Sequence, residues 1–197
     1  EQAIQVLHPT VTPYWEEVYG ADVSEDGRRL AMVSPHRLFM WEIGESRPAH
    51  AIRWSIPRAS SVFGMLRDAS YCLVDSGDCH QDFAVRSYNF ETGYMGRRFG
   101  NFGDAVTRVI CSHDAQTVLM LSNDNSARLF EVASGKLLRV NVMKDRPILA
   151  AFRPDDKSVA IVSSSGDVTL WDLTGEQEFY ASNFGGDILA EGQEARD

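Results

Sequence analysis

The chain has 197 residues, a formal net charge of −9 and a hydrophobic content of 44%. That content is ordinary for a globular protein and argues against wholesale disorder. No apolar run approaches the roughly 20 residues that a membrane-spanning helix needs. The acidic balance disfavours nucleic-acid binding, which requires a broad basic face. The length allows one domain with a sizeable core or two very small ones.

The number of cysteines indicates the redox state of the cellular compartment in which the protein works. Cys72, Cys79 and Cys111 form an odd set, which does not fit a disulfide framework. A reducing environment is therefore expected, and we predict a cytoplasmic or nuclear protein.

The first 17 residues precede any regular pattern. Ile4–Leu7 favours a short strand, which Pro9 and Pro13 then interrupt. Beyond this segment the chain is dominated by short stretches of period-2 alternation separated by turns, which is typical of half-buried β-strands.

A pattern of about 40 residues occurs four times along the chain. In each copy an acidic turn leads into a hydrophobic strand, as in SEDGRRLAMV (Ser24–Val33) and RPDDKSVAIV (Arg153–Val162). A later strand of each copy carries a large aromatic residue, and these residues are spaced 47, 42 and 41 positions apart: Trp41, Tyr88, Phe130 and Trp171. Because they occupy equivalent positions, we predict that they are core residues and not a stacking platform for a ligand.

These copies resemble the WD-repeat β-propeller family, most closely in LWDLTGE and SNDNSARLFEVASGK. The resemblance covers about residues 18–182 and implies an all-β fold of four-stranded antiparallel blades. The blades it implies span residues 18–56, 57–99, 100–142 and 143–182. It also implies that a strand within residues 1–17 closes the ring, and it leaves residues 183–197 as an acidic, Gly-rich tail or linker.

The match to the family pattern is incomplete. No blade carries the family's Gly-His pair, and only the last blade keeps a Trp-Asp pair. In the family, an Asp six residues before the aromatic braces the blade through hydrogen bonds. Asp82 and Asp124 stand at that position here, whereas Pro35 and Ser165 replace it in the first and last blades. The resemblance therefore implies bracing in the two middle blades.

Four blades do not determine how the ring is completed. They could close alone as a small ring, or they could belong to a larger ring completed by further sequence, a second copy or a partner chain. An open stack would leave apolar faces uncovered at both ends. We favour an incomplete or partner-completed propeller.

Two stretches resemble sites for chemistry, and both are better explained structurally. The loop Asp75–Asp82 holds three carboxylates, a thiol and an imidazole, but it lacks the paired ligands of a zinc site and the dense acidic pattern of a calcium site. His113 lies in a Ser-His-Asp stretch, yet no nucleophile elbow occurs in the chain. We predict no catalytic, cofactor-binding or metal site.

The loops between second and third strands, and those between blades, are expected to open on one face. The resemblance implies that this face binds a protein or peptide partner. Its basic residues and an aromatic anchor suit an acidic or phosphorylated peptide. The expected partner-binding residues are His36, Arg58, His80, Phe102, Asn125, Lys144 and Arg146.

Repetition without a convergent catalytic constellation favours binding over catalysis. We therefore predict a non-catalytic protein–protein interaction platform that is a subunit or domain of a larger assembly. The alternative is a propeller that supports or gates a catalytic domain outside this chain.

Overall fold

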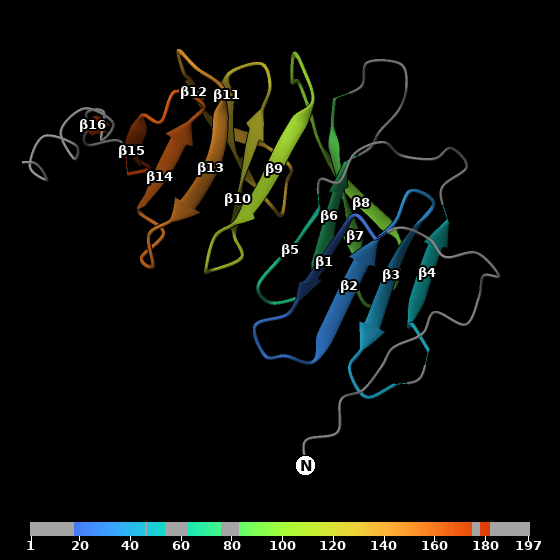
Figure 1. The fold of residues 1–197 in the computed structure, drawn as a ribbon. Coiled ribbons are helices and arrows are strands. Elements are labelled where there is room, and N and C mark those ends of the chain that lie inside the picture. The colour runs from blue at the N-terminus through green and yellow to red at the C-terminus, as the bar shows by residue number, and fades with distance from the viewer. Residues whose placement is uncertain (1–17, 46, 54–62, 76–82, 175–177, 182–197) are drawn as a thin grey trace, which may run out of the picture.

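The computed structural model describes residues 18–45, 47–53, 63–75, 83–174 and 178–181, which form sixteen strands in four sheets (Figure 1). Blade 1 contains β1 (Gly20–Val23), β2 (Arg29–Val33), β3 (Arg37–Glu42) and β4 (His50–Arg53). Blade 2 contains β5 (Phe63–Met65), β6 (Tyr71–Asp75), β7 (Val85–Asn89) and β8 (Met95–Phe99). Blade 3 contains β9 (Val106–Cys111), β10 (Thr117–Ser122), β11 (Ser126–Glu131) and β12 (Leu137–Val142). Blade 4 contains β13 (Pro147–Phe152), β14 (Ser158–Ser163), β15 (Val168–Asp172) and β16 (Glu178–Ala181).

Each blade is an antiparallel sheet of four consecutive strands, so the predicted all-β fold of four-stranded blades is confirmed. The first strands of successive blades lie against one another, with β1 contacting β5, β5 contacting β9 and β9 contacting β13. Figure 1 shows the blades fanning out from these inner strands in an arc that does not close. The ring-closing strand expected within residues 1–17 and the tail at residues 183–197 lie outside the described residues.

The turn between the first and second strands has the same geometry in all four blades. Its fourth residue has a positive φ, and its backbone N–H donates to the carbonyl three residues earlier. The preceding Asp accepts a hydrogen bond from a backbone N–H two residues later, as Asp26 does from Arg28 at 3.0 Å. This is a type I turn followed by a left-handed residue. The residues with positive φ are Gly27, Ala69, Ala115 and Asp156.

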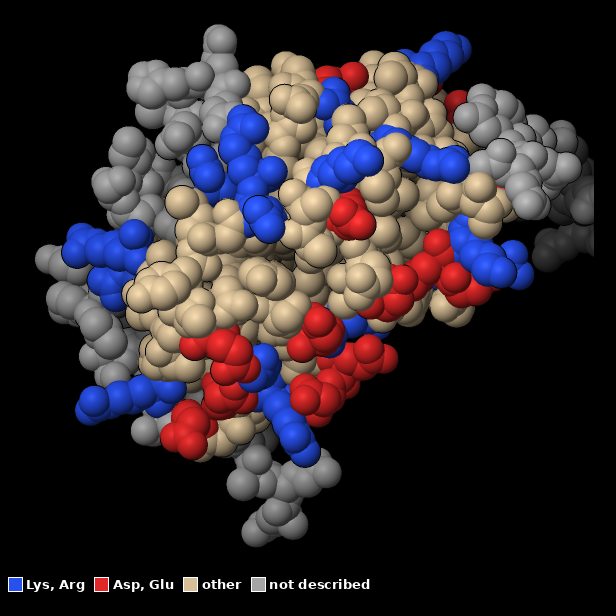
Figure 2. Space-filling view, turned by 180° about the vertical axis from the view of Figure 1, so that it is seen from behind, with Lys and Arg blue, Asp and Glu red and all other residues tan. Residues whose placement is uncertain are grey.

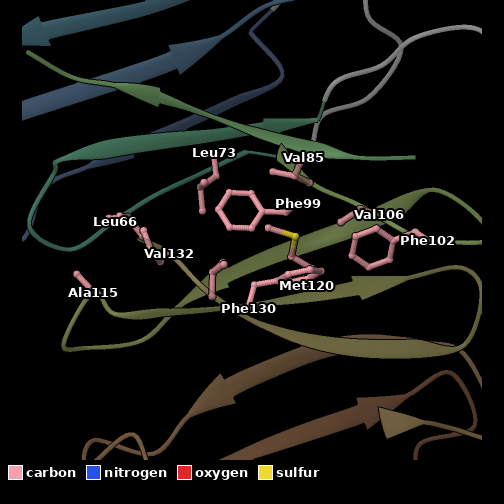
Figure 3. Close-up of a cluster of buried hydrophobic side chains, with 11 residues drawn as sticks. Leu66, Leu73, Val85, Phe99, Phe102, Val106, Ala115, Met120, Phe130 and Val132 are labelled. Atoms are coloured by element: carbon pink, nitrogen blue, oxygen red, sulfur yellow. The ribbon is translucent and has the colours of Figure 1, made fainter. Parts of the chain in front are cut away.

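The cores lie between blades and not within them. Alternate side chains of each sheet point to its two faces, and each blade therefore packs on its neighbours. Figure 3 shows the largest cluster among the described residues. In it, Phe99 of blade 2 packs edge to face on Phe130 of blade 3, with the ring centroids 5.6 Å apart. The four repeated aromatic residues are all buried, at Trp41, Tyr88, Phe130 and Trp171.

Within the described part of the chain, no helix is long and apolar enough to cross a membrane. Cys72 and Cys111 are free thiols.

Candidate protein-interaction surfaces

Part of the predicted loop face comes together at one corner of blade 3. The Asn125 side chain donates to the Lys144 carbonyl at 3.5 Å, and Arg146 donates to Asn123 Oδ1 at 3.4 Å. Lys144 and Arg146 are exposed, and among the described residues neither has an ion-pair partner within 4.0 Å. We call Asn125, Lys144 and Arg146 the basic corner.

The other expected contact residues are placed differently. His36 is exposed on the β2–β3 turn of blade 1, a different blade from the basic corner. Phe102, which the sequence suggested as an exposed anchor, is instead buried, with the Arg128 guanidinium 4.6 Å from its ring centroid. Its ring packs against Phe130 and is core. Arg58 and His80 lie outside the described residues, as does Asp82.

Asp124 joins the β10–β11 turn to the connection between blades 2 and 3. Its Oδ2 accepts hydrogen bonds from Gly103 N at 2.8 Å and Arg128 Nη2 at 3.0 Å, while Oδ1 accepts from Ser126. Burial favours a higher pKa for Asp124, but the hydrogen bonds from Ser126, Gly103 and Ser122 outweigh it and lower the pKa. The carboxylate therefore has a structural environment that keeps it charged.

His113 serves a contact between blades. Its ring Nδ1 and its backbone N–H both hydrogen-bond Asp156 Oδ1, at 2.9 and 3.0 Å. The neighbouring Ser112 hydroxyl donates to Asp114 Oδ1 at 2.6 Å. Because the His113 ring bonds Asp156 and neither Ser112 nor Asp114, this Ser-His-Asp stretch lacks the mutual geometry of a hydrolytic triad. Among the described residues, no three acidic, histidine or cysteine side chains are grouped as metal ligands would be.

One class of contact was not anticipated from the sequence. In three of the four copies, the side chain nine positions after the repeated aromatic residue hydrogen-bonds a backbone carbonyl of the next blade. His50 Nε2 lies 2.9 Å from the Glu91 carbonyl, Arg97 Nε lies 3.0 Å from that of Ala133, and Arg139 Nη1 lies 3.5 Å from that of Asp172. The signal in the sequence was a hydrogen-bond donor at a fixed offset from each aromatic.

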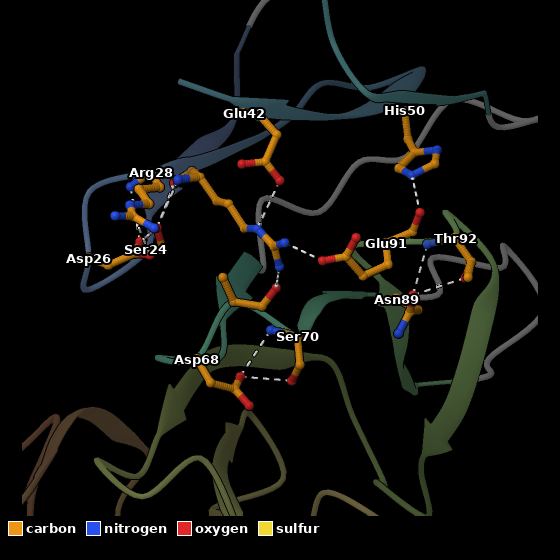
Figure 4. A network of polar contacts seen from close by, with 12 residues as sticks. Ser24, Asp26, Arg28, Glu42, His50, Asp68, Ser70, Asn89, Glu91 and Thr92 are labelled. Atoms are coloured by element: carbon orange, nitrogen blue, oxygen red, sulfur yellow. Dashed lines mark hydrogen bonds and ion pairs between the residues drawn. The ribbon is translucent and has the colours of Figure 1, made fainter. Parts of the chain in front are cut away.

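A second polar contact reinforces the junction between blades 1 and 2. Arg29 donates to Glu42 Oε1 at 3.0 Å within blade 1 and pairs with Glu91 of blade 2. Its guanidinium also lies 4.6 Å from the Phe90 ring centroid. Figure 4 shows the bonds to Glu42 and Glu91 meeting between the two sheets, beside the bond from His50 to the Glu91 carbonyl.

The two ends of the arc differ. At the blade 1 end, Phe39 and Trp41 point away from blade 2 and are buried within this single chain. At the blade 4 end, the described side chains that point away from blade 3 are apolar and range from half-buried to exposed, with Leu149 51% exposed and Leu170 37% exposed. We call this the open face of blade 4; it consists of Leu149, Ala151, Ala160, Val162, Val168 and Leu170.

The open face repeats a face that is buried one blade earlier. Leu119, Leu121, Ala127 and Leu129 of blade 3 are buried against blade 4. The residues 41 positions later are Ala160, Val162, Val168 and Leu170. The open face thus has the register and chemistry of a blade–blade interface, and no following blade lies on it among the described residues.

Charge is unevenly distributed over the molecule. In Figure 2, acidic side chains gather in a band along the lower part of the visible face and basic side chains lie mainly above it. The turns at the end where the first strand of each blade finishes carry exposed acidic residues, including Glu25, Asp26, Asp68 and Asp114.

No family model matches the chain. It is 23% identical over 177 residues to autophagy-related protein 16 of Arabidopsis thaliana, an alignment that covers 84% of this chain and 33% of that protein. It is 28% identical over 119 residues to human WD repeat-containing protein 55, covering 59% of this chain and 30% of that protein. The chain thus spans about a third of the length of these relatives. Similarity to a protein named for WD repeats agrees with the repeat period and the four-stranded sheets.

Proposed function

We propose that this chain is a non-catalytic protein–protein interaction platform that works as part of a larger assembly in the cytoplasm or nucleus. The observation that carries the proposal is the open face of blade 4. Three junctions within the chain bury faces of this kind, and among the described residues a fourth face of the same register is partly exposed. Contiguous exposed apolar surface of this kind marks an interaction site.

The occupant of the open face is a β-sheet that packs as a following blade would, supplied by a partner protein or by sequence beyond this segment. Each following blade in this chain brings one large aromatic side chain onto its neighbour, as Trp171 does on blade 3. A second copy of this chain cannot supply that side chain from blade 1, because its Trp41 is already buried. Burying the exposed parts of Leu149 and Leu170 would contribute roughly 2 kcal/mol, so additional contacts elsewhere must support the complex.

The basic corner supports a second contact within the same function. Lys144 and Arg146 are neighbouring exposed cations without carboxylate partners among the described residues. Cations in this state suit an acidic or phosphorylated peptide. The alternative function, support of a catalytic domain outside this chain, would use the same open face.

Site-specific photo-crosslinking tests the platform. A crosslinker at position 170 should give a discrete product with a partner protein in cell extract, and one at Val142 should not. Val142 is 75% exposed but lies on the outer edge of blade 3. Leu170→Arg should weaken binding of the purified partner at least tenfold, with Val142→Arg as the matched control. Crosslinking only to a second copy, or equal loss in both variants, would rule out the proposed occupant.

A further inference from the structure

The inner strands of blades 1, 2 and 3 line a half-open cavity of about 300 Å³. Its walls come from the ends of β1, β5 and β9, where each strand enters the turn to its second strand. This volume lies at the lower limit of small-molecule pockets. It therefore suits a single side chain better than a larger ligand.

The lining of the cavity mixes polar and apolar surface in similar amounts, and its acidic side chains come from blade 1. Met65 and Leu66 of blade 2 and Val109 and Ile110 of blade 3 supply the apolar surface. Asp22 and the exposed Glu25 of blade 1 supply carboxylates. Among the described residues that line it, Arg67 is the only cation, and its side chain is exposed.

Asp22 is held in a fixed position at the junction of two blades. Its Oδ1 accepts a hydrogen bond from Val23 N at 2.9 Å, and its Oδ2 accepts one from Met65 N at 3.2 Å. A carboxylate has about four acceptor sites, so each oxygen can accept a further hydrogen bond. The backbone of blade 2 thereby orients the group while leaving capacity for a ligand.

The charged residues around the cavity wall produce a net negative electrostatic potential at Cys111. Burial, and then the Asp22 carboxylate, raise the pKa of the Cys111 thiol to about 12; Arg67 opposes this and Asp68 adds to it. The carboxylates thus outweigh Arg67 at a residue that lines the cavity.

We propose that this cavity binds a lysine or arginine side chain of a protein partner. The aliphatic stem would pack on Met65, Val109 and Ile110, and the cationic head would meet Asp22 and Glu25. Long basic side chains combine these two properties, because their methylene stems bury readily while their heads stay charged. This site is separate from the open face of blade 4, and the two proposals can fail independently.

Methyl NMR on the whole chain, labelled at Met, Ile and Val, tests the proposal with defined peptides. Acetyl-Gly-Arg-Gly-amide should shift the methyl signals of Met65, Val109 and Ile110, with millimolar affinity expected for a ligand of this size. The matched peptides with Leu or Glu in place of Arg should bind at least tenfold more weakly. Raising the salt concentration should weaken Arg-peptide binding, because part of the attraction is between partly exposed charges.

Variants localise the effect. Asp22→Asn should weaken Arg-peptide binding about tenfold, and Glu25→Gln, which is exposed and leaves the fold intact, about threefold. Asp155→Asn, in the equivalent turn of blade 4, removes the same charge away from the cavity and should change binding less than twofold. The proposal is overturned if the Arg peptide shifts no cavity methyl up to about 10 mM. It is also overturned if the Leu or Glu peptide binds as well, or if Asp155→Asn matches Glu25→Gln.

Discussion

The Asp156 carboxylate of blade 4 accepts hydrogen bonds from both the ring Nδ1 and the backbone N–H of His113 in blade 3, at 2.9 and 3.0 Å. Its second oxygen accepts from the backbone N–H of Asp114 at 2.9 Å. One carboxylate therefore fastens the turns of two blades that are also joined by apolar packing and by the bond from Arg139 to the Asp172 carbonyl.

Asp156→Asn should lower the free energy of unfolding by about 1–2 kcal/mol, because it replaces charge-assisted hydrogen bonds with weaker ones. Urea unfolding at neutral pH measures the loss. The exposed neighbour Asp155 serves as the control, and Asp155→Asn should stay within about 0.5 kcal/mol of the unchanged chain. Equal losses in both variants would show that the contact with His113 adds no stability.

The contact between Asp156 and His113 also predicts that the stability of the fold decreases in acid. Burial alone would raise the pKa of Asp156, but hydrogen bonds from His113 and Asp114 lower it overall. A carboxylate with a depressed folded-state pKa adds stability that is complete above its unfolded pKa, near 4, and is lost as the pH falls through the lower folded value. The stability difference between the unchanged chain and Asp156→Asn should therefore shrink below about pH 4. A difference that stays constant down to about pH 2 would contradict this.

Phe130→Ala should lower the free energy of unfolding by about 3–5 kcal/mol, because it removes a buried ring from the core between blades 2 and 3. Calorimetry or denaturant unfolding measures the change. Tyr94, which is 77% exposed, provides the comparison, and Tyr94→Ala should be nearly neutral. A small loss at Phe130 would mean that the blades do not depend on this core.

Gly27→Ala should destabilise the first turn of blade 1 by about 1 kcal/mol. Gly27 has φ +68°, and nothing lies within 4 Å of a Cβ added there, so the cost is backbone strain alone. Gly103→Ala would meet only ordinary contacts with Asp124, without a positive φ, and should be close to neutral. Thermal unfolding of the two variants side by side separates strain from crowding.

The thiols of Cys72 and Cys111 should resist alkylation at pH 8 in the folded chain and react readily in urea. Burial is the main reason that the pKa of each rises to about 12, and the reactive thiolate is therefore scarce. Because the unfolded thiols ionise near pH 9 and the folded ones do not, stability should fall as the pH rises above 9. Mass spectrometry of alkylated peptides measures both residues. Rapid labelling at pH 8 of Cys72, which is fully buried, would contradict the prediction, while the half-buried Cys111 should react more slowly than in urea.

His50, Arg97 and Arg139 should each contribute about 0.5–1.5 kcal/mol through their bonds to the next blade. Their contacts lie at three different junctions, so the losses on substitution by Ala should add. Arg108, an exposed residue of β9, is the control position for loss of an arginine. Non-additive losses would show that the junctions are energetically coupled.

The strands, the turns and the four-blade organisation can be predicted from the amino-acid sequence alone. Alternation of apolar and polar residues, Asp and Gly at turn positions and the spacing of Trp41, Tyr88, Phe130 and Trp171 are local properties that a chain carries before it folds. Each also recurs once per blade, and a pattern that holds in one copy was therefore supported by the others.

Which side chains face one another across the blades depends on how the sheets pack in three dimensions. Phe102 reads as a loop aromatic in the sequence, yet it is buried beneath Arg128, a residue that belongs to a strand of the same blade. The bonds that His50, Arg97 and Arg139 make to the next blade join residues 41, 36 and 33 positions apart. The cavity beside Asp22 brings together residues as distant as Asp22 and Cys111. Such contacts depend on the angle and register at which whole sheets pack. Local sequence patterns do not determine that angle or register.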